Sequence, residues 1–346
     1  MKKFKYLGAF IIPILGIYTF NSTGHKAYFG LIFLYLIIPI LEIIFPPNNN
    51  NLDAREKDLA SNDPYYDLIL FLSVPLHLYV IFVFFNTVSN EAIYNSDLIA
   101  YIFMMGTILG VNGINIGHEL GHKTKDKFKT FLSHIMLLTS IQNHFIPYHN
   151  AGHHRDVGTP NDLSSAREGD IFYFFAVRSQ IGGYFKAWRL ENERLKSLNK
   201  NIFLNPMILY AILNLLLLSA IYYYFGFNVT SFYFMAAIYG ISILEAQNYF
   251  SHYGLRRKLL ENGRYERVKP SHSWNSDHIF GRILLFELTR HSDHHHSGSK
   301  PYQILESEEN SPTLPFGYPA MLILSYFPFI FIPLMKKHLK NYADFN

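Results

Sequence analysis

The sequence predicts an all-α integral membrane protein with six transmembrane helices and a cytoplasmic, helical, histidine-rich domain. Composition supports this fold class, because 49% of the 346 residues are hydrophobic and only 16% are charged, against about a quarter charged in ordinary soluble domains. The mean hydropathy is only +0.08, so a substantial polar portion must accompany the apolar segments. Several apolar runs approach about 20 residues, the length that crosses a bilayer as a helix.

Six apolar segments are predicted to span the membrane. The first follows the basic start Met1–Lys5, but no small-residue cleavage site closes its apolar run. It is therefore predicted to be a retained span and not a signal peptide. In chain order the predicted spans are Tyr6–Phe20, Ala27–Phe45, Leu68–Phe85, Asp97–Gly117, Asn205–Phe225 and Val229–Phe250.

The positions of Lys and Arg predict the orientation, because basic residues beside short loops favour the cytoplasmic side. The connections Thr87–Ser96 and Phe227–Val229 contain neither Lys nor Arg. Basic residues instead lie at the N-terminus and after each even-numbered span: Lys2, Lys3 and Lys5; Arg55 and Lys57; Lys123, Lys125, Lys127 and Lys129; and Arg256, Arg257 and Lys258. Both termini are therefore predicted to be cytoplasmic.

Two further apolar stretches are not counted as spans. Phe131–Phe145 is short for a span and is predicted to be a buried or re-entrant helix. Tyr318–Met335 is interrupted by Pro328 and Pro333, so it is predicted to lie at the interface. The chain then divides into helices one to four (1–117), a cytoplasmic segment (118–204), helices five and six (205–250) and a second cytoplasmic segment (251–346).

Most of the 17 histidines fall into three groups in the predicted cytoplasmic half. A spacing of four residues on a helix puts two imidazoles on one face, which suits a shared metal ion. His252, at the inner end of the sixth predicted span, is placed to approach the same layer. The three groups are His118 and His122; His149, His153 and His154; and His291, His294, His295 and His296.

This donor set predicts a metal centre of unusual size. The chain has no Cys, which excludes thiolate zinc sites, iron–sulfur clusters and disulfides. About nine imidazoles exceed the four ligands of one tetrahedral zinc, so two metal ions are predicted. Ligand softness alone does not choose among Zn, Fe, Cu and Ni, but a redox site under apolar walls fits oxygen chemistry on a lipophilic molecule.

Each histidine group also permits a simpler interpretation. His118–His122 also matches the H-E-x-x-H zinc-protease motif with Glu119 as general base, although that function leaves the other groups without a purpose. One histidine cluster alone is compatible with a solvated patch. The net charge of +4 is too small, and the charged residues are too scattered, to indicate nucleic-acid binding. The isolated histidines His25, His77, His134, His144 and His338 are interpreted as structural, and His272 and His278 as supporting or packing residues.

The extended motifs resemble the integral-membrane alkane 1-monooxygenases, within the membrane fatty acid desaturase and hydroxylase superfamily. The resemblance covers most of the chain and rests on the three histidine boxes together with several longer strings. Those strings are Asn248–Gly254 (Asn-Tyr-x-x-His-Tyr-Gly), Arg290–His295, Arg155–Pro160, His272–Ser276 and Tyr302–Gln303.

The resemblance implies a cytoplasmic catalytic domain that holds two non-haem iron ions on nine histidines, with His296 outside the pattern. The implied ligands are His118, His122, His149, His153, His154, His252, His291, His294 and His295. This chain departs from the family at Tyr148, Ala151, Ser251 and Lys300–Pro301, but no departure removes a ligand. Carboxylates close in sequence that are candidates to support the ligands are Glu119, Asp156, Asp162, Asp170, Asp277 and Asp293.

The resemblance also implies an activity, a location and a partner. These are hydroxylation of the terminal methyl of n-alkanes with O2, in a bacterial inner membrane, using electrons from rubredoxin and its reductase. No nucleotide-binding motif is readable in the chain, so electrons must come from outside. Lys123–Lys129 and Arg256–Lys258 are either contacts for an acidic rubredoxin or the ordinary basic excess of cytoplasmic loops. A related oxygenase acting on alkylbenzene methyl groups or acyl chains remains the alternative.

Overall fold

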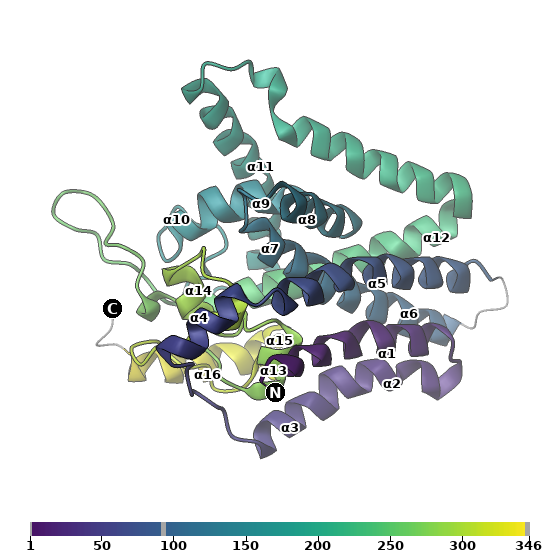
Figure 1. Cartoon of the computed structure of the whole chain (residues 1–346), viewed down its shortest axis with the longest axis horizontal. Helices are drawn as coiled ribbons and strands as arrows, with labels where there is room; N and C mark the ends of the chain where they lie inside the picture. Colours follow the sequence, from purple (N-terminus) through teal and green to yellow (C-terminus); the bar gives the residue numbers. More distant parts are fainter. Residues whose placement is uncertain (1, 91–94, 343–346) are drawn as a thin grey trace. The chain divides into compact units, whose positions relative to one another are not determined.

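The computed structural model describes residues 2–90 and 95–342, and within these residues it contains helices and loops but no β-strand (Figure 1). Two isolated bridges, Leu259–Tyr265 and Asn275–Thr313, are the extended pairings seen in the described residues. The all-α prediction is confirmed. Met1, residues 91–94 of the predicted Thr87–Ser96 connection, and residues 343–346 lie outside the described part.

The α-helices follow one another with short 3₁₀ and π-helical turns between them. The first half of the chain contains α1 (Ile11–Phe20), α2 (Phe29–Ile32), α3 (Ile38–Ile44), α4 (Ala54–Asn62), α5 (Tyr65–Val88), α6 (Asn95–Ile108), α7 (Asn115–Gly121), α8 (Lys127–Thr139), α9 (Phe145–Tyr148) and α10 (His154–Asp156). The second half contains α11 (Phe172–Ser197), α12 (Pro206–His252), α13 (Ile279–Leu284), α14 (His291–His296), α15 (Tyr318–Ser325) and α16 (Pro328–Asn341).

Among the described residues, five helical segments are long and apolar enough to cross a membrane. They are Lys3–Phe20, Gly24–Ile44, Tyr65–Val88, Asn95–Gly121 and Pro206–His252. The last one, α12, contains both the fifth and the sixth predicted spans. Its helix is interrupted at Gly226, where φ is 81° and ψ is 179°, a conformation essentially restricted to glycine. Figure 1 shows that the chain changes direction sharply within α12.

The two stretches that were not predicted to span are indeed absent from these candidates. Phe131–Phe145 is divided between α8, a short loop and the start of α9. Tyr318–Met335 is divided between α15 and α16, and Pro328 is the first residue of α16. Proline fits the first turn of a helix because its missing N–H would have no intrahelical partner there.

The chain forms two compact units, each assembled from three stretches. The first contains Met1–Ile37, Pro64–Ile146 and Glu191–Leu244. In it, α1 packs against α5 and α6, and α7 packs against α8 (Figure 1). A Cβ atom added at Gly110 would lie 2.9 Å from the carbonyl oxygen of Gly240, so glycine permits close contact between two backbones here.

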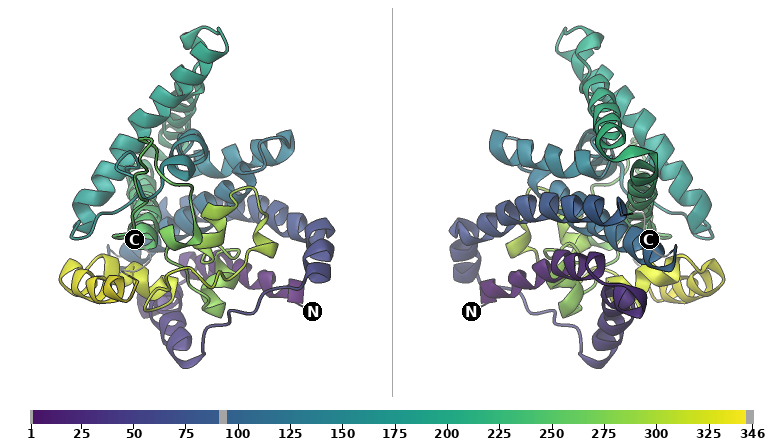
Figure 2. Two further views of the ribbon diagram at one scale, coloured as in Figure 1. Left: turned by 90° about the vertical axis from the view of Figure 1, so that its left-hand side faces the viewer. Right: turned by 90° about the vertical axis from the view of Figure 1, so that its right-hand side faces the viewer.

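The second unit contains Ile38–Asp63, Pro147–Leu190 and Glu245–Asn346. It is richer in short helices and loops, as the light green and yellow segments of Figure 2 show. Buried side chains brace these loops. Glu42 Oε1 accepts a hydrogen bond from the Gly281 amide at 2.7 Å, and Arg290 donates to the carbonyl oxygens of Leu305 at 2.6 Å and Asn50 at 3.0 Å. Arg290 thereby fixes the loop immediately before α14.

Candidate metal centre

The first histidine pair lies at the end of α7 in the first unit. His118 and His122 are one helical turn apart, and their Nε2 atoms are 2.8 Å from each other, as the four-residue spacing predicts. Small residues allow α8 to approach this turn closely. A Cβ atom at Gly117 would lie 2.9 Å from Leu137 Cγ, and Ser133 Oγ donates a hydrogen bond to the Gly117 carbonyl at 2.5 Å.

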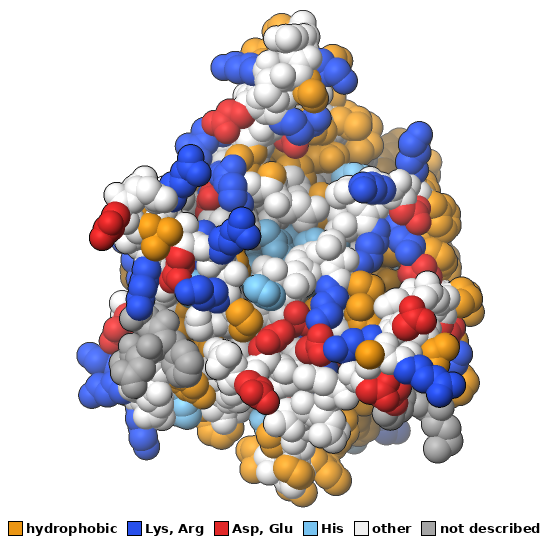
Figure 3. Space-filling model, turned by 60° about the vertical axis from the view of Figure 1, so that its left-hand side comes forward, with side chains coloured by type: hydrophobic (Ala, Val, Ile, Leu, Met, Phe, Trp, Pro, Cys, Tyr) orange, Lys and Arg blue, Asp and Glu red, His pale blue; other side chains and the backbone are white. Residues whose placement is uncertain are grey.

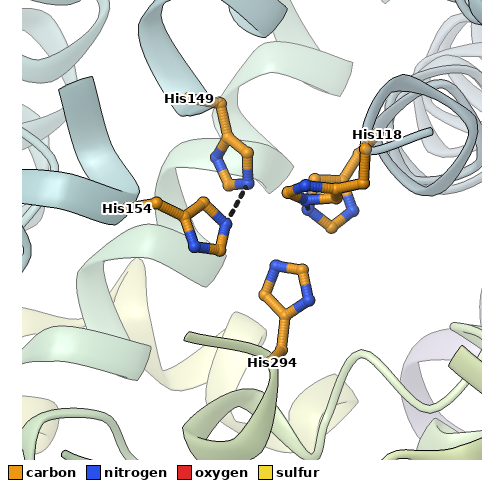
Figure 4. Close-up of side chains that lie close together, drawn as sticks. His118, His149, His154 and His294 are labelled. Atoms are coloured by element: carbon orange, nitrogen blue, oxygen red, sulfur yellow. Dashed lines mark hydrogen bonds between the residues drawn. The ribbon is translucent and has the colours of Figure 1, made fainter. Parts of the chain in front are cut away.

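The second box adopts a π-helical turn over His149–His153 instead of an α-helical one. A π-helix has a wider turn than an α-helix, so the partner of His149 is five residues away. His149 Nε2 and His154 Nε2 are 2.9 Å apart, and Figure 4 shows their two rings converging. The ring of His294, from α14, lies near them, with its centroid 4.9 Å from that of His154. The structure thus differs from the His149–His153 pairing that the four-residue spacing suggested.

Four other histidines form a separate buried group in the second unit. They come from the π-helical turn, the end of α12 and both turns of α14, and one ring nitrogen of each lies within 4.8 Å of the others. His291 Nε2 is 3.1 Å from His252 Nε2. On α14, the four-residue spacing brings His291 and His295 together, whereas His294 turns toward His149 and His154. The group consists of His153, His252, His291 and His295.

The hydrogen bonding of this group fits a bound metal ion. His153 uses Nδ1 to contact Asp162 at 2.9 Å, while its buried Nε2 has no hydrogen-bond partner among the described residues. Both ring nitrogens of buried His295 also have no such partner in the described part of the chain. Buried polar atoms in native proteins are almost always partnered, and metal-bound imidazoles characteristically give their second nitrogen to a carboxylate. An imidazole-rich, thiolate-free donor set suits iron, zinc, copper or nickel.

The protonation state of His295 is also suitable for binding a metal. Burial, followed by the charges of His154, His291, His252 and His153, holds the pKa of His295 well below its ordinary value. Metals bind the neutral form of imidazole. His295 is therefore ready to act as a ligand at neutral pH without first losing a proton.

Asp162 is the buried carboxylate that supports His153. Its Oδ2 accepts hydrogen bonds from His153 and from Ser165 Oγ at 2.6 Å, and its Oδ1 accepts from Tyr148 OH at 3.0 Å. Burial alone would raise the pKa of Asp162, but the charge of His153 and the bonds from His153 and Ser165 outweigh it and lower the pKa. An ionised Asp162 fixes the orientation of the His153 ring.

Hydrogen bonds extend from Asp162 to a second buried carboxylate, Glu245 on α12. Tyr148 OH is 2.9 Å from Ser164 Oγ, which is 2.8 Å from Ser179 Oγ, and Ser179 hydrogen-bonds to Glu245. In the sequence, Tyr148 is notable only as a departure from the family pattern, and nothing there distinguishes Glu245. No spacing signal connects these residues, because they come from separate parts of the chain.

The remaining candidate carboxylates pair with cations. Asp156 lies 2.7 Å from Lys186 Nζ, Asp170 lies 2.7 Å from Arg178, and Asp293 lies 2.6 Å from Lys300 Nζ. Asp277 lies 3.2 Å from Arg290 and Glu119 lies 3.9 Å from Lys123.

The remaining histidines lie outside the clusters described above. His272 Nδ1 accepts from the Lys269 amide at 2.9 Å, and the backbone of His272 hydrogen-bonds to the His252 ring, which agrees with a supporting role. His77 Nε2 is 2.8 Å from Thr139 Oγ1. Within the described residues, neither histidine group includes His25, His77, His134, His144, His272, His278, His296 or His338.

Long apolar helices together with buried groups of histidines define a helical membrane protein with side chains able to bind metal ions. The family model "Fatty acid desaturase" matches residues 96–324. Alkane 1-monooxygenase 1 of Alcanivorax borkumensis is 36% identical over 339 residues, which cover 96% of this chain and 82% of the relative. Alkane 1-monooxygenase of Pseudomonas putida is 34% identical over 340 residues, covering 96% and 83%. The chain belongs to the fatty acid desaturase family and is grouped there with the alkane 1-monooxygenases.

A more distant relative belongs to the same comparison. The xylene/toluene monooxygenase hydroxylase component of Pseudomonas putida is 25% identical over 344 residues, which cover 96% of this chain and 89% of the relative.

Proposed function

We propose that this chain is an alkane 1-monooxygenase that inserts one oxygen atom of O2 into the terminal C–H bond of an n-alkane and yields a 1-alkanol. The observation that carries the proposal is the buried four-histidine group, in a chain 36% identical to a named alkane 1-monooxygenase over nearly its whole length. The same comparison implies a lipophilic substrate that partitions into the membrane.

Two non-haem iron ions and nine histidine ligands form part of the proposal. One iron is assigned to His153, His252, His291 and His295. His149, His154 and His294 are assigned to the other. His118 and His122, in the first unit, complete the proposed set of nine ligands. The excess of imidazoles over the four ligands of one zinc site supports a centre of two metal ions.

The bound irons would supply the activation of O2, and the chain's own residues hold and orient them. Asp162 fixes His153, and the His272 backbone fixes His252. Aromatic side chains restrict water near the ligands: the Phe145 ring centroid is 5.9 Å from that of His118, and Phe250 and Tyr253 beside His252 are almost fully buried. A dry site strengthens every electrostatic interaction inside it. An alkane would enter between the apolar spans.

The proposed location is a bacterial inner membrane, with six spans and with both termini and the histidine groups on the cytoplasmic side. The interruption of α12 at Gly226 supports counting its two arms as separate spans. In the proposed topology the chain divides into four parts, with boundaries after residues 117, 204 and 250.

Rubredoxin, reduced by its reductase, is the proposed electron donor. On the face shown in Figure 3, histidine side chains reach the surface among Lys and Arg side chains. His154 is half-buried and His296 is exposed. Basic residues that would attract an acidic donor are Arg256, Arg257 and Lys258 in the second unit, with Lys123, Lys125, Lys127 and Lys129 in the first.

A second candidate function is oxidation of alkylbenzene methyl groups, favoured by the 25% identity to the xylene/toluene enzyme component. It ranks lower because the alkane relatives are more similar. Hydroxylation or desaturation of acyl chains would use the same histidine groups. A zinc protease acting through Glu119 would need only His118 and His122 of the first box.

The test is to measure the iron and zinc content of the purified membrane protein, and its conversion of n-octane to 1-octanol when rubredoxin and its reductase are added. The variant His252→Ala should lose iron and 1-octanol formation, whereas His296→Ala, which changes a neighbouring exposed histidine, should keep both. Two irons per chain without 1-octanol would retain the centre but change the substrate. One zinc and no iron would refute the oxygenase function.

A further inference from the structure

Helix α11 exposes a continuous stripe of large apolar side chains. Phe174, Val177, Ile181 and Phe185 are exposed by 76%, 59%, 54% and 65%. Their spacings of three, four and four residues place them on one face of the helix. A face of this kind, on a helix that is not itself a candidate span, indicates an apolar partner outside the chain.

The stripe is not required to fold α11, because the opposite face already packs against the second unit. Phe172 and Phe175 are almost fully buried, and their ring centroids lie 5.7 Å and 5.3 Å from that of Tyr249. Leu190 continues this buried face toward the end of the helix. The helix is therefore held in place while its second apolar face points outward.

The two edges of the stripe carry the side chains that suit a lipid surface. Arg178, Arg189 and Lys196 are separated by 11 and 7 residues and so share one edge. Tyr184 and Trp188, one turn apart and half-buried, lie along the other edge. Basic side chains favour anionic lipid headgroups, and Tyr and Trp favour the boundary between headgroups and acyl chains.

The apolar exposure continues along the chain directly into a candidate span. Ile202, Phe203 and Leu204, which follow α11, are exposed by 47%, 78% and 65%. Pro206 then begins α12, and only 6% of the apolar window of α12 is buried. Because α12 leads into the bilayer, the surface next to it along the chain has lipid within reach.

We propose that α11 is a membrane-surface helix whose stripe of Phe174, Val177, Ile181 and Phe185 inserts into the cytoplasmic leaflet of a bilayer containing anionic lipid. Such helices bury their apolar face about 5–10 Å into the headgroup boundary. The proposal concerns how the histidine-bearing segment is attached to the membrane and is independent of the reaction that the metal centre performs.

Because the chain has no Cys, single cysteines can be labelled with an environment-sensitive fluorophore without other changes. The test positions are Ile181→Cys and, in case one variant fails to fold, Val177→Cys. Leu215→Cys on α12 serves as the bilayer control, and Glu261→Cys in an exposed loop as the water control. Each protein is reconstituted in vesicles of phosphatidylcholine and phosphatidylglycerol.

The label at 181 or 177 should be quenched by a lipid nitroxide placed near the headgroup and protected from aqueous iodide. The label at 215 should respond more to a nitroxide deep in the acyl chain, and the label at 261 to iodide alone. Iodide quenching of 181 and 177 equal to that of 261 would refute the proposal. Protection from both quenchers would also refute it, because it would place another protein surface over the stripe.

Discussion

At the scale of single residues, the structure assigns different roles to carboxylates that look equivalent in sequence. Asp162 contacts His153, whereas Asp170, only eight residues further, pairs with Arg178. Substituting Asp162→Asn should lower metal affinity about 10–100-fold, the usual cost of losing a carboxylate that supports a metal-bound histidine. Asp170→Asn is the matched control and should keep its metal.

The measurement is metal content after dialysis against increasing chelator, with the helical circular dichroism spectrum recorded to show that both variants remain folded. Equal metal retention by the two variants would show that Asp162 does not support a ligand.

The spacing of the histidines and the family resemblance bring nine of them forward as candidate ligands, but neither indicates how these histidines divide into groups. His153 and His154 are adjacent in the chain, yet one lies with His252 and the other with His149. Their directions depend on the local helix type, and the residues of His149–His153 contain no signal for a π-helix. Asp162 was one of six carboxylate candidates because proximity in sequence does not determine which side chain reaches an imidazole.

At the scale of elements, Gly226 separates the two arms of α12. A residue with a Cβ atom at φ 81° and ψ 179° is strained by about 1–3 kcal/mol. Gly226→Ala should therefore lower the thermal midpoint of the detergent-solubilised protein. Ser219→Ala, in the regular part of the same helix, should leave the midpoint unchanged. An unaltered midpoint for Gly226→Ala would mean that the two arms do not need this backbone conformation.

The predicted boundary between the fifth and sixth spans lies between Phe225 and Val229. This boundary coincides with the break in α12. The lengths of α13 and α14 were not predictable, because these short helices are fixed by contacts such as those of Arg290 and Glu42.

The loop after α12 carries an acid-sensitive contact. Burial would raise the pKa of Glu266, but the Lys269 side chain, the Lys258 amide and His272 outweigh it and lower the pKa from 4.5 to about 2. The stabilisation by ionised Glu266 is therefore complete above about pH 4.5 and is lost as the pH falls toward 2. Glu266→Gln should make the thermal midpoint less dependent on pH between these values.

Glu261→Gln, which changes an exposed carboxylate in the same loop, is the matched control for Glu266→Gln. Its pH dependence should equal that of the unmodified protein. If the two variants show the same slope of thermal midpoint against pH, the contacts of Glu266 do not contribute to acid sensitivity.

At the scale of the whole molecule, the proposed six-span topology predicts which residues face each side of the membrane. In intact cells, Ser96→Cys should react with a membrane-impermeant maleimide, because it ends a connection without Lys or Arg. Lys125→Cys should react only after the membrane is permeabilised. Labelling of both variants in intact cells, or of neither, would contradict the orientation. Gel shift of the purified protein gives the readout.

The π-helical turn at His149–His153 makes the second box sensitive to residue number more than to residue type. Ala151 is exposed, so many side chains fit at that position, and the family difference noted there is tolerable. Deleting Ala151 would instead leave His149 and His154 four residues apart, the spacing of an α-helical turn, and the π-helical turn would be lost. In related chains, the exposed position 151 should therefore vary in residue type, whereas the number of residues between His149 and His154 should stay constant.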